Sequence, residues 1–187
     1  IQPDGKTVIG GQFGSYNGVT RNGVARMNVN GSLDVTFNPG DGIGDPYNDF
    51  VACLALAPNG KIVIGGNFSF FNGAQRNGIA RLNDNGSLDA SFNPQLGANG
   101  TVWAVAVQSD NKVIIGGWVL DGQYVGEPSG AIRAFDVETG KFVWAWDMDR
   151  PGQSGEPAEG QSYSHGTPNV WGTMSADDKL GLVYLPM

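Results

Sequence analysis

The sequence is poor in the side chains that most often build metal centres and nucleophilic catalytic sites. Among 187 residues it has one cysteine, Cys53, and one histidine, His165. A single cysteine excludes a disulfide within the chain and any metal cage made of several thiolates. One histidine cannot form a metal triad of imidazoles. Cys53 stands in an apolar run, which favours a small buried filler over a reactive thiol.

Basic residues and long apolar runs are also scarce. The chain has 11 Lys and Arg against 18 Asp and Glu, a formal net charge of −7. Affinity for nucleic acid needs a basic surface, so we expect no nucleic-acid partner. No apolar run reaches the roughly 18 residues of a membrane span, so we expect no span in this chain. The sequence begins inside a repeat without a recognisable signal peptide, and we expect it to be a piece of a larger protein.

What the sequence does have is a repeat. Residues 8–39 and 63–94 agree at about two thirds of their positions at a fixed offset of 55. A third copy begins with Val-Ala-Val at 105–107 and the run KVIIGG at 112–117, but the later signatures of the repeat do not return. Thirty glycines and ten prolines, without a collagen-like period, fit a turn-rich β protein.

Each copy has the pattern of a propeller blade. In the second copy, apolar runs at 53–57 and 62–64 flank an Asn-Gly pair, which predicts a tight hairpin. Residues 79–82 alternate like a half-buried strand, and the next Asn-Gly pair leads into a short last strand. Such a unit buries its faces only by packing on neighbours. We therefore predict an all-β fold of β-propeller blades, three copies plus part of a fourth, with four-stranded antiparallel sheets. We expect an incomplete ring whose open blade edges allow self-association.

Composition changes sharply after the second copy. Fifteen asparagines lie before residue 112 and only Asn169 follows, whereas four of the five tryptophans come after residue 117. This shift predicts two units, β repeats over residues 1–111 and a different propeller segment over residues 112–187.

The first unit resembles the bacterial delta-60 repeats over about residues 1–110. The shared signatures are PDGK, YNG or FNG, RNG, ARMN or ARLN, NGSLD and FNP, in this order. The resemblance implies a β-propeller-like scaffold without an established catalytic role. It also implies a secreted or cell-surface protein, and thus a periplasmic or extracellular location in bacteria.

The second unit carries AFDVETGKFVW at 134–144, which fits the pattern Ala-x-Asp-x-x-Thr-Gly-x-x-x-Trp. From the residues alone, Asp136 and Thr139 cap a tight turn with Gly140 in the left-handed conformation, and Trp144 serves packing. This pattern is the tryptophan-docking motif of quinoprotein alcohol and sugar dehydrogenases. Together with its flanks, the segment resembles the membrane-bound quinoprotein glucose dehydrogenases over about residues 112–187.

That resemblance implies an eight-bladed propeller exposed to the periplasm, with pyrroloquinoline quinone (PQQ) and a divalent metal, calcium or magnesium, as cofactors. The implied reaction oxidises a small sugar or polyol and passes the electrons to the quinone pool. By position, Trp171 matches the indole that lies against the quinone plane, and Asn169 is a supporting polar group. Asp121 matches a carboxylate that holds the metal. Gly122 stands where many relatives have Asn, so a surface turn is the alternative for Asp121.

The family's catalytic base stands in a His-Asp-x-Trp-Asp-x-Asp segment. The run Trp146-Asp147-Met148-Asp149 looks similar, but it directly follows the docking tryptophan and lacks the preceding His-Asp. We interpret it as non-catalytic and name no catalytic residue. We therefore predict a fragment of a PQQ-dependent sugar or polyol dehydrogenase propeller, inactive alone because the base lies beyond the chain. The alternative is a non-catalytic secreted or cell-surface β-propeller scaffold.

Overall fold

The computed structural model describes residues 1–57, 59–95, 97–98, 100–108, 112–117, 130–159, 161–164, 174–177 and 182–184. Every regular element in these ranges is a β-strand, and all strand pairs are antiparallel. The described part of the chain contains no helix that is long and apolar enough to cross a membrane. The predicted all-β class is confirmed.

The strands are numbered in the order of the sequence. They are β1 (Thr7–Gly10), β2 (Ser15–Tyr16), β3 (Val19–Thr20), β4 (Val24–Met27), β5 (Phe50–Leu56), β6 (Ile62–Asn67), β7 (Phe70–Phe71), β8 (Ala74–Gln75), β9 (Ile79–Leu82), β10 (Val102–Val107), β11 (Lys112–Gly117), β12 (Ile132–Asp136), β13 (Phe142–Trp146), β14 (Ser175–Asp177) and β15 (Leu182–Tyr184).

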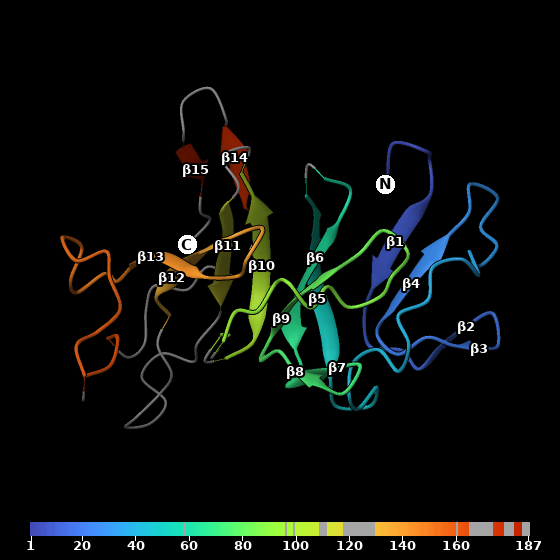
Figure 1. Ribbon diagram of the computed structural model, residues 1–187, viewed down its shortest axis with the longest axis horizontal. Helices are drawn as coiled ribbons and strands as arrows, with labels where there is room; N and C mark the ends of the chain where they lie inside the picture. Colours follow the sequence, from blue (N-terminus) through green and yellow to red (C-terminus); the bar gives the residue numbers. More distant parts are fainter. Residues whose placement is uncertain are drawn as a thin grey trace.

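Three sheets, with two, three and four strands, form blades that stand side by side (Figure 1). The first blade pairs β1 with β4, the second has the order β5-β6-β9, and the third has the order β10-β11-β12-β13. The pair β14–β15 begins a fourth unit, and β2–β3 and β7–β8 are short hairpins. Within the described residues the sheets do not join into a ring, which agrees with an incomplete propeller.

The four-stranded sheet is fully formed in the third blade, whereas the fourth strand of each repeat is a single bridge. Met27 bridges to Leu33 in the first copy, and Leu82 bridges to Leu88 in the second. The next residue in each copy is a buried aspartate, Asp34 or Asp89, whose carboxylate turns inward to an arginine of the same blade. The same carboxylate accepts from the amide and hydroxyl of Thr36 or Ser91, and this local turn follows the last strand pairing of the copy.

Tight turns with glycine in the left-handed conformation close the hairpins. Between β5 and β6, the Ala57 amide donates to the Lys61 carbonyl over 2.8 Å, and Gly60 has a φ of 79°. Asn59 adds its side-chain oxygen as acceptor for the Lys61 amide. A non-glycine residue at such a φ is strained, so the Asn-Gly pair of the sequence specifies this turn.

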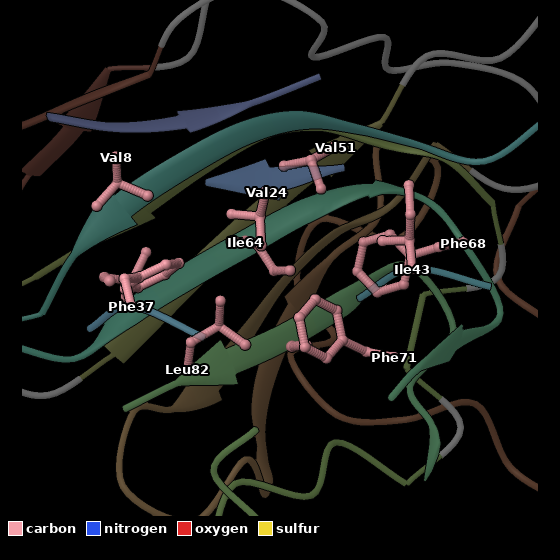
Figure 2. Packing of buried hydrophobic residues seen from close by; sticks show 11 residues of the cluster. Val8, Val24, Phe37, Ile43, Val51, Ile64, Phe68, Phe71 and Leu82 are labelled. Atoms are coloured by element: carbon pink, nitrogen blue, oxygen red, sulfur yellow. The ribbon is translucent and has the colours of Figure 1, made fainter. Parts of the chain in front are cut away.

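The apolar core lies between the blades rather than inside any one of them. Figure 2 shows the first cluster, in which Val8 and Val24 of the first blade meet Ile64 and Leu82 of the second. A second cluster joins the second and third blades, and a third lies on the far side of the third blade. Each sheet is thus stabilised by its neighbour, as expected of stacked repeats.

Candidate functional site: the third blade and its seam with the repeats

The tryptophan-docking segment forms the turn between β12 and β13. The Asp136 carboxylate accepts from the Thr139 amide at 2.7 Å and from the Thr139 hydroxyl at 2.6 Å. Gly140 follows with a φ of 74°, and its amide donates to the Asp136 carbonyl. The hydrogen bonds from Thr139, its hydroxyl first, lower the pKa of Asp136. The predicted cap, with Gly140 in the left-handed conformation, is confirmed.

The docking tryptophan, Trp144, lies on β13 opposite Ala134 of β12. It is half-buried and packs against an apolar cluster on the far side of the third blade, together with Trp146. The fully or nearly buried members of this cluster are Ala104, Ala106, Ile114, Ile132, Ala134 and Met174. Met174 directly precedes β14, so this cluster joins the third blade to the next unit of the chain.

On its other side, the third blade meets the second through Arg81. The Arg81 side chain is fully buried, and its Nε donates to the Asp89 carboxylate over 2.8 Å. Nη2 reaches across to the main-chain oxygen of Glu138 over 2.8 Å, and Nη1 lies 3.6 Å from the Glu138 carboxylate. The Asn93 amide donates to the Thr139 carbonyl over 3.0 Å. We call these contacts the second seam.

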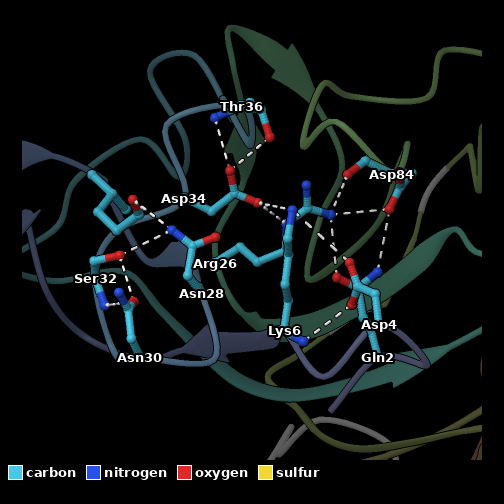
Figure 3. Close-up of polar contacts among 11 residues, drawn as sticks. Gln2, Asp4, Lys6, Arg26, Asn28, Asn30, Ser32, Asp34, Thr36 and Asp84 are labelled. Atoms are coloured by element: carbon cyan, nitrogen blue, oxygen red, sulfur yellow. Dashed lines mark hydrogen bonds and ion pairs between the residues drawn. The ribbon is translucent and has the colours of Figure 1, made fainter.

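The first and second blades meet through the same arrangement, the first seam (Figure 3). Arg26 donates from Nε to Asp34 over 2.8 Å, and from Nη1 to the main-chain oxygen of Asp84 over 2.8 Å. The Asn38 amide donates to the Asn85 carbonyl over 2.7 Å. The Glu-Thr-Gly turn of the docking motif therefore occupies the place that the Asp-Asn-Gly turn occupies in the repeat.

Two glycines let the blades approach at these seams. A Cβ on Gly86 would lie 3.0 Å from the Asn38 nitrogen, and a Cβ on Gly140 would lie 2.8 Å from the Asn93 nitrogen. The corresponding glycine of the first copy, Gly31, is exposed and has nothing within 4 Å of such a Cβ. The close approach is thus a property of the seam and not of the turn.

In the third blade, an alanine stands at the position that Arg81 has in the second blade. In the second blade Arg81 stands opposite Val63, and at the matching position of the third blade Ala134 stands opposite Ile114. The ion pair of the repeats is replaced by an apolar pair, because Trp144 now faces Ala134. Among the described residues, the arginine contact thus occurs at the first and second seams, and the far side of the third blade packs through apolar side chains.

The loop after β13 forms a small open hollow on the third blade. Its lining residues are Asp147, Arg150, Gln153, Gly155, Glu156, Pro157 and Tyr163. The guanidinium of Arg133 lies 4.7 Å from the centre of the Tyr163 ring. The Tyr163 hydroxyl is buried and has no hydrogen-bond partner in the described part of the chain. Burial raises the pKa of Tyr163, against the attraction of Arg133.

Asp147, in the run that resembles the family's catalytic segment, is bound by main-chain amides of its own loop. It is buried, and its carboxylate accepts from the amides of Ser164 at 2.8 Å and of Asp149 at 3.2 Å. Burial alone would raise the pKa of Asp147, but the hydrogen bonds, chiefly from Ser164, lower it. A carboxylate held ionised in this way ties down the loop between residues 147 and 164.

The three residues predicted for the cofactor and the metal, Trp171, Asn169 and Asp121, lie outside the described residues, as does His165. In the ranges that the structure describes, no three His, Cys, Asp or Glu side chains gather closely enough to hold a metal ion. In the third blade, the carboxylate of Asp136 is used in a turn and that of Glu138 in an ion pair. The structure therefore offers no further metal ligands in its described part.

The seams are the feature that sequence reasoning missed. The signal was present, because Arg26, Asp34 and Asn38 recur as Arg81, Asp89 and Asn93 at the offset of 55. The identity of the acceptor could not be seen, since it is a main-chain oxygen that any residue supplies.

Two family models match the chain over partly overlapping ranges. Residues 79–187 match the family described as glucose/ethanol/alcohol dehydrogenase, beta-propeller domain. Residues 2–37 and 57–92 match a domain of unknown function (DUF5122) described as a β-propeller. The two matches overlap over residues 79–92, so the boundary between residues 111 and 112 stays a prediction. No solved structure matches the chain.

Several curated relatives share the C-terminal part of the chain. The glycerol dehydrogenase large subunit of Gluconobacter oxydans (strain 621H) is 51% identical over 74 residues, which are 40% of this chain and 10% of that protein. Quinoprotein glucose dehydrogenase A of Acinetobacter calcoaceticus is 39% identical over 80 residues, 43% of this chain and 10% of the relative. The quinate/shikimate dehydrogenase (quinone) of Acinetobacter baylyi (strain ATCC 33305 / BD413 / ADP1) is 36% identical over 75 residues, 40% of this chain and 9% of the relative.

The chain spans about a tenth of the length of these relatives. The family match covers more than half of the chain, and it includes the whole of β12, the Asp136–Gly140 turn and β13. On this match and on its antiparallel blades, the chain belongs to the quinoprotein family of glucose/ethanol/alcohol dehydrogenase β-propeller domains.

Proposed function

We propose that this chain contributes blades to a PQQ-dependent sugar or polyol dehydrogenase, with a periplasmic or extracellular location. The observation that carries the proposal is the docking turn, in which Asp136, Thr139 and Gly140 have the roles that the motif requires and Trp144 packs the blade. Two of the relatives are a glycerol dehydrogenase and a quinoprotein glucose dehydrogenase, which supports a polyol or a sugar as the substrate class.

In this proposal, residues 112–187 hold one side of the cofactor, and the repeats of residues 1–111 extend the stack of blades. Trp171 would lie against the plane of PQQ, because a rigid indole gives a flat, electron-poor ring system a large contact surface. Asn169 would support it with its amide, and Asp121 would supply one carboxylate to a calcium or magnesium ion. Bound PQQ would accept the hydride of the substrate alcohol.

We further propose that the chain has no dehydrogenase activity by itself. Removal of the hydroxyl proton needs a base, and no His-Asp-x-Trp-Asp-x-Asp segment occurs in these 187 residues. Asp147 does not replace it, since its buried carboxylate oxygens already accept from the Ser164 and Asp149 amides, and its lowered pKa makes it a weak base. The contribution of this chain would be binding and orientation.

A titration of the full chain with PQQ and calcium tests the proposal through tryptophan fluorescence. We expect saturable quenching that is largely lost in Trp171→Phe. The matched control is Trp103→Phe, because Trp103 contacts Phe50 of the second blade, with ring centres 5.4 Å apart, and should not report on PQQ. Quenching that is equal in both variants, or absent, would contradict cofactor binding. A dye-reduction assay with glucose and glycerol should show no turnover.

The second candidate is a non-catalytic propeller scaffold, which the two seams favour. A buried arginine joins the two repeats, and another joins the second repeat to the third blade. Neither contact requires a cofactor. An intact, stable chain that shows no quenching by PQQ would support this scaffold over the dehydrogenase fragment.

A further inference from the structure

Each seam has a side-chain amide that donates to the acidic residue of the receiving turn. At the first seam the Gln2 amide donates to the Asp84 carboxylate over 3.3 Å (Figure 3). At the second seam the Asn59 amide donates to the Glu138 carboxylate over 3.0 Å. Asn59 stands in the hairpin between β5 and β6, at the position of Asp4 in the first copy. The second seam thus takes its amide donor from a turn that has a carboxylate in the first copy.

The residue that follows the amide differs between the two seams. Gln2 precedes Pro3, which has no N–H, whereas Asn59 precedes Gly60. The main-chain nitrogen after an asparagine can attack the Cγ of its side chain, and a glycine there has no Cβ to obstruct closure of the five-membered ring. Gly60 is exposed, and nothing lies within 4 Å of a Cβ built on it. The turn therefore has room to close that ring.

The hairpin also supports the charge that develops in this attack. The Lys61 amide donates to Oδ1 of Asn59 over 3.2 Å. Negative charge gathers on this oxygen when a nitrogen adds to Cγ, and a hydrogen bond to it stabilises the intermediate. The Gly60 amide donates to the Ala57 carbonyl over 3.0 Å, so this bond has to open before the Gly60 nitrogen attacks. At an exposed turn such local opening costs little free energy.

We propose that Asn59-Gly60 is a site of spontaneous deamidation, which removes the amide contact of the second seam. The Gly60 nitrogen forms a bond to Cγ of Asn59, its proton passes through solvent to Nδ2, the Cγ–Nδ2 bond breaks, and Nδ2 leaves as ammonia. Water then opens the succinimide ring at one of its two carbonyls and leaves aspartate or isoaspartate. No electrons are transferred, and water is the co-reactant.

The product places a negative charge beside Glu138. A carboxylate cannot donate, so the bond to Glu138 is lost and two carboxylates face each other. Glu138 also lies 3.6 Å from Nη1 of Arg81, and its main-chain oxygen accepts from Nη2. Repulsion of Glu138 therefore weakens the arginine contact of the second seam. The first seam keeps its Gln2 amide, because the proline nitrogen that follows has no proton to lose.

Asn85-Gly86 is a matched control within the same chain. The Ser87 amide donates to Oδ1 of Asn85 over 3.0 Å, so the turn has the same local bond as the hairpin at Asn59. Gly86, however, is buried in the first seam, where a Cβ would lie 3.0 Å from the Asn38 nitrogen. We expect Asn59 to react at least about 10-fold faster than Asn85, because the first seam must open before the turn at Asn85 can rearrange.

Incubation of the full chain in mildly alkaline buffer at physiological temperature, followed by peptide mass spectrometry, measures both rates. Water enriched in a heavy oxygen isotope marks the products, because opening of the ring adds one oxygen from water, and fragment spectra assign the mass gain to a residue. Asn59→Gln should abolish the gain at this position, since the longer side chain would have to close a larger ring. A rate at Asn59 no higher than the rate at Asn85 would overturn the proposal.

Deuterium exchange of the Asn93 amide, which donates to the Thr139 carbonyl over 3.0 Å, measures the consequence at the second seam. Asn59→Asp carries the charge of the product, and we expect it to speed this exchange about 2- to 10-fold, which corresponds to the loss of one hydrogen bond. The Asn38 amide at the first seam should change less. Unchanged exchange at Asn93, or an equal change at Asn38, would overturn the role of Asn59 at the second seam. Neither measurement involves PQQ, so the proposed dehydrogenase role is tested separately.

Discussion

Arg81 donates to the main-chain oxygen of Glu138 over 2.8 Å, and Arg26 donates to the main-chain oxygen of Asp84 over the same distance. The first contact joins a repeat to a quinoprotein blade, and the second joins two repeats. The seam between the second repeat and the third blade thus has the same arginine contact as the seam between the two repeats. The following predictions test what these seams contribute.

Replacement of Arg81 by Ala should destabilise the chain by about 3–5 kcal/mol, because it leaves Asp89 buried with one fewer cation and removes the donor to Glu138. Urea unfolding followed by fluorescence measures the change. The double variant Arg81→Met/Asp89→Leu removes both charges and should cost less than the single one. Equal losses in both variants would mean that the seam contact, and not the unpaired carboxylate, carries the effect.

Asparagine at the three turn glycines should separate seam packing from turn strain. Gly31, Gly86 and Gly140 have φ values of 81°, 86° and 74°, which asparagine tolerates better than other side chains. At Gly86 and Gly140 the added side chain meets the neighbouring blade, and we expect losses of about 1–3 kcal/mol. Gly31→Asn, in open space, should stay within about 0.5 kcal/mol of the parent. A large loss at Gly31 would show that strain in the turn dominates.

Stability should fall in acid because of Asp34 and Asp89. Burial alone would raise the pKa of both carboxyls, but the bonds from Thr36 and Lys6, and from Lys61 and Ser91, lower both well below the ordinary value of 3.8. At pH values above this ordinary pKa, both carboxylates contribute their full stabilisation to the folded chain. As the pH falls below about 4, the unfolded chain binds protons that the folded chain does not, at a cost of up to about 1.4 kcal/mol per pH unit for each group.

Urea unfolding at pH values between about 2 and 6 measures this dependence. Asp89→Asn is less stable at neutral pH and should show a shallower loss in acid, because one of the two groups no longer titrates. A stability that is constant over this range would contradict the assignment.

Cys53 should be nearly inert to alkylation in the folded chain. Burial raises the pKa of its thiol to about 12, and its Sγ lies 3.6 Å from the Val102 carbonyl at the boundary between the second and third blades. At about pH 8 only a minute fraction is thiolate, so iodoacetamide should react at least about 100-fold more slowly than in urea. Arg81→Ala should raise the native rate by opening the second seam. A fast reaction in the parent chain would contradict the burial of this boundary.

Trp144 should matter for stability more than Trp103. Trp144→Ala removes a large side chain from the apolar cluster around Ile132 and Met174, and we expect a loss of about 3 kcal/mol in urea unfolding. Trp103→Phe keeps an aromatic ring beside Phe50 and should cost less than about 1.5 kcal/mol. If Trp144→Ala were as mild as Trp103→Phe, the docking role of Trp144 would be wrong for this blade.

Much of the fold was readable because glycine and asparagine mark its turns. The Asn59-Gly60 hairpin and the Asp136–Gly140 cap are local structures, specified by a few neighbouring residues, and both were predicted correctly. The short last strand of the repeats was predicted only in part. The chain turns after Asp89, whose carboxylate binds Arg81 and the amide and hydroxyl of Ser91, and the alternation of apolar residues does not contain these polar contacts.

The candidate site was less accessible to sequence reasoning. A motif could show that Asp136 and Trp144 belong to one turn and one strand, but not that Glu138 receives an arginine from the blade before it. Trp171, Asn169 and Asp121 remain predictions from resemblance, because they lie outside the described residues.

At both seams the arginine donates to a peptide carbonyl, in addition to the carboxylate of Asp84 or Glu138, and this bears on how such a chain can arise. A carbonyl oxygen is present whatever the side chain, so recombination between two gene families keeps the contact as long as a glycine turn falls at the right place. Gly86 and Gly140 meet that condition in sequences that otherwise differ. Blades of two different families can therefore meet through the same main-chain contact, to which the acidic residue of the turn, Asp84 or Glu138, adds an ion pair with the arginine.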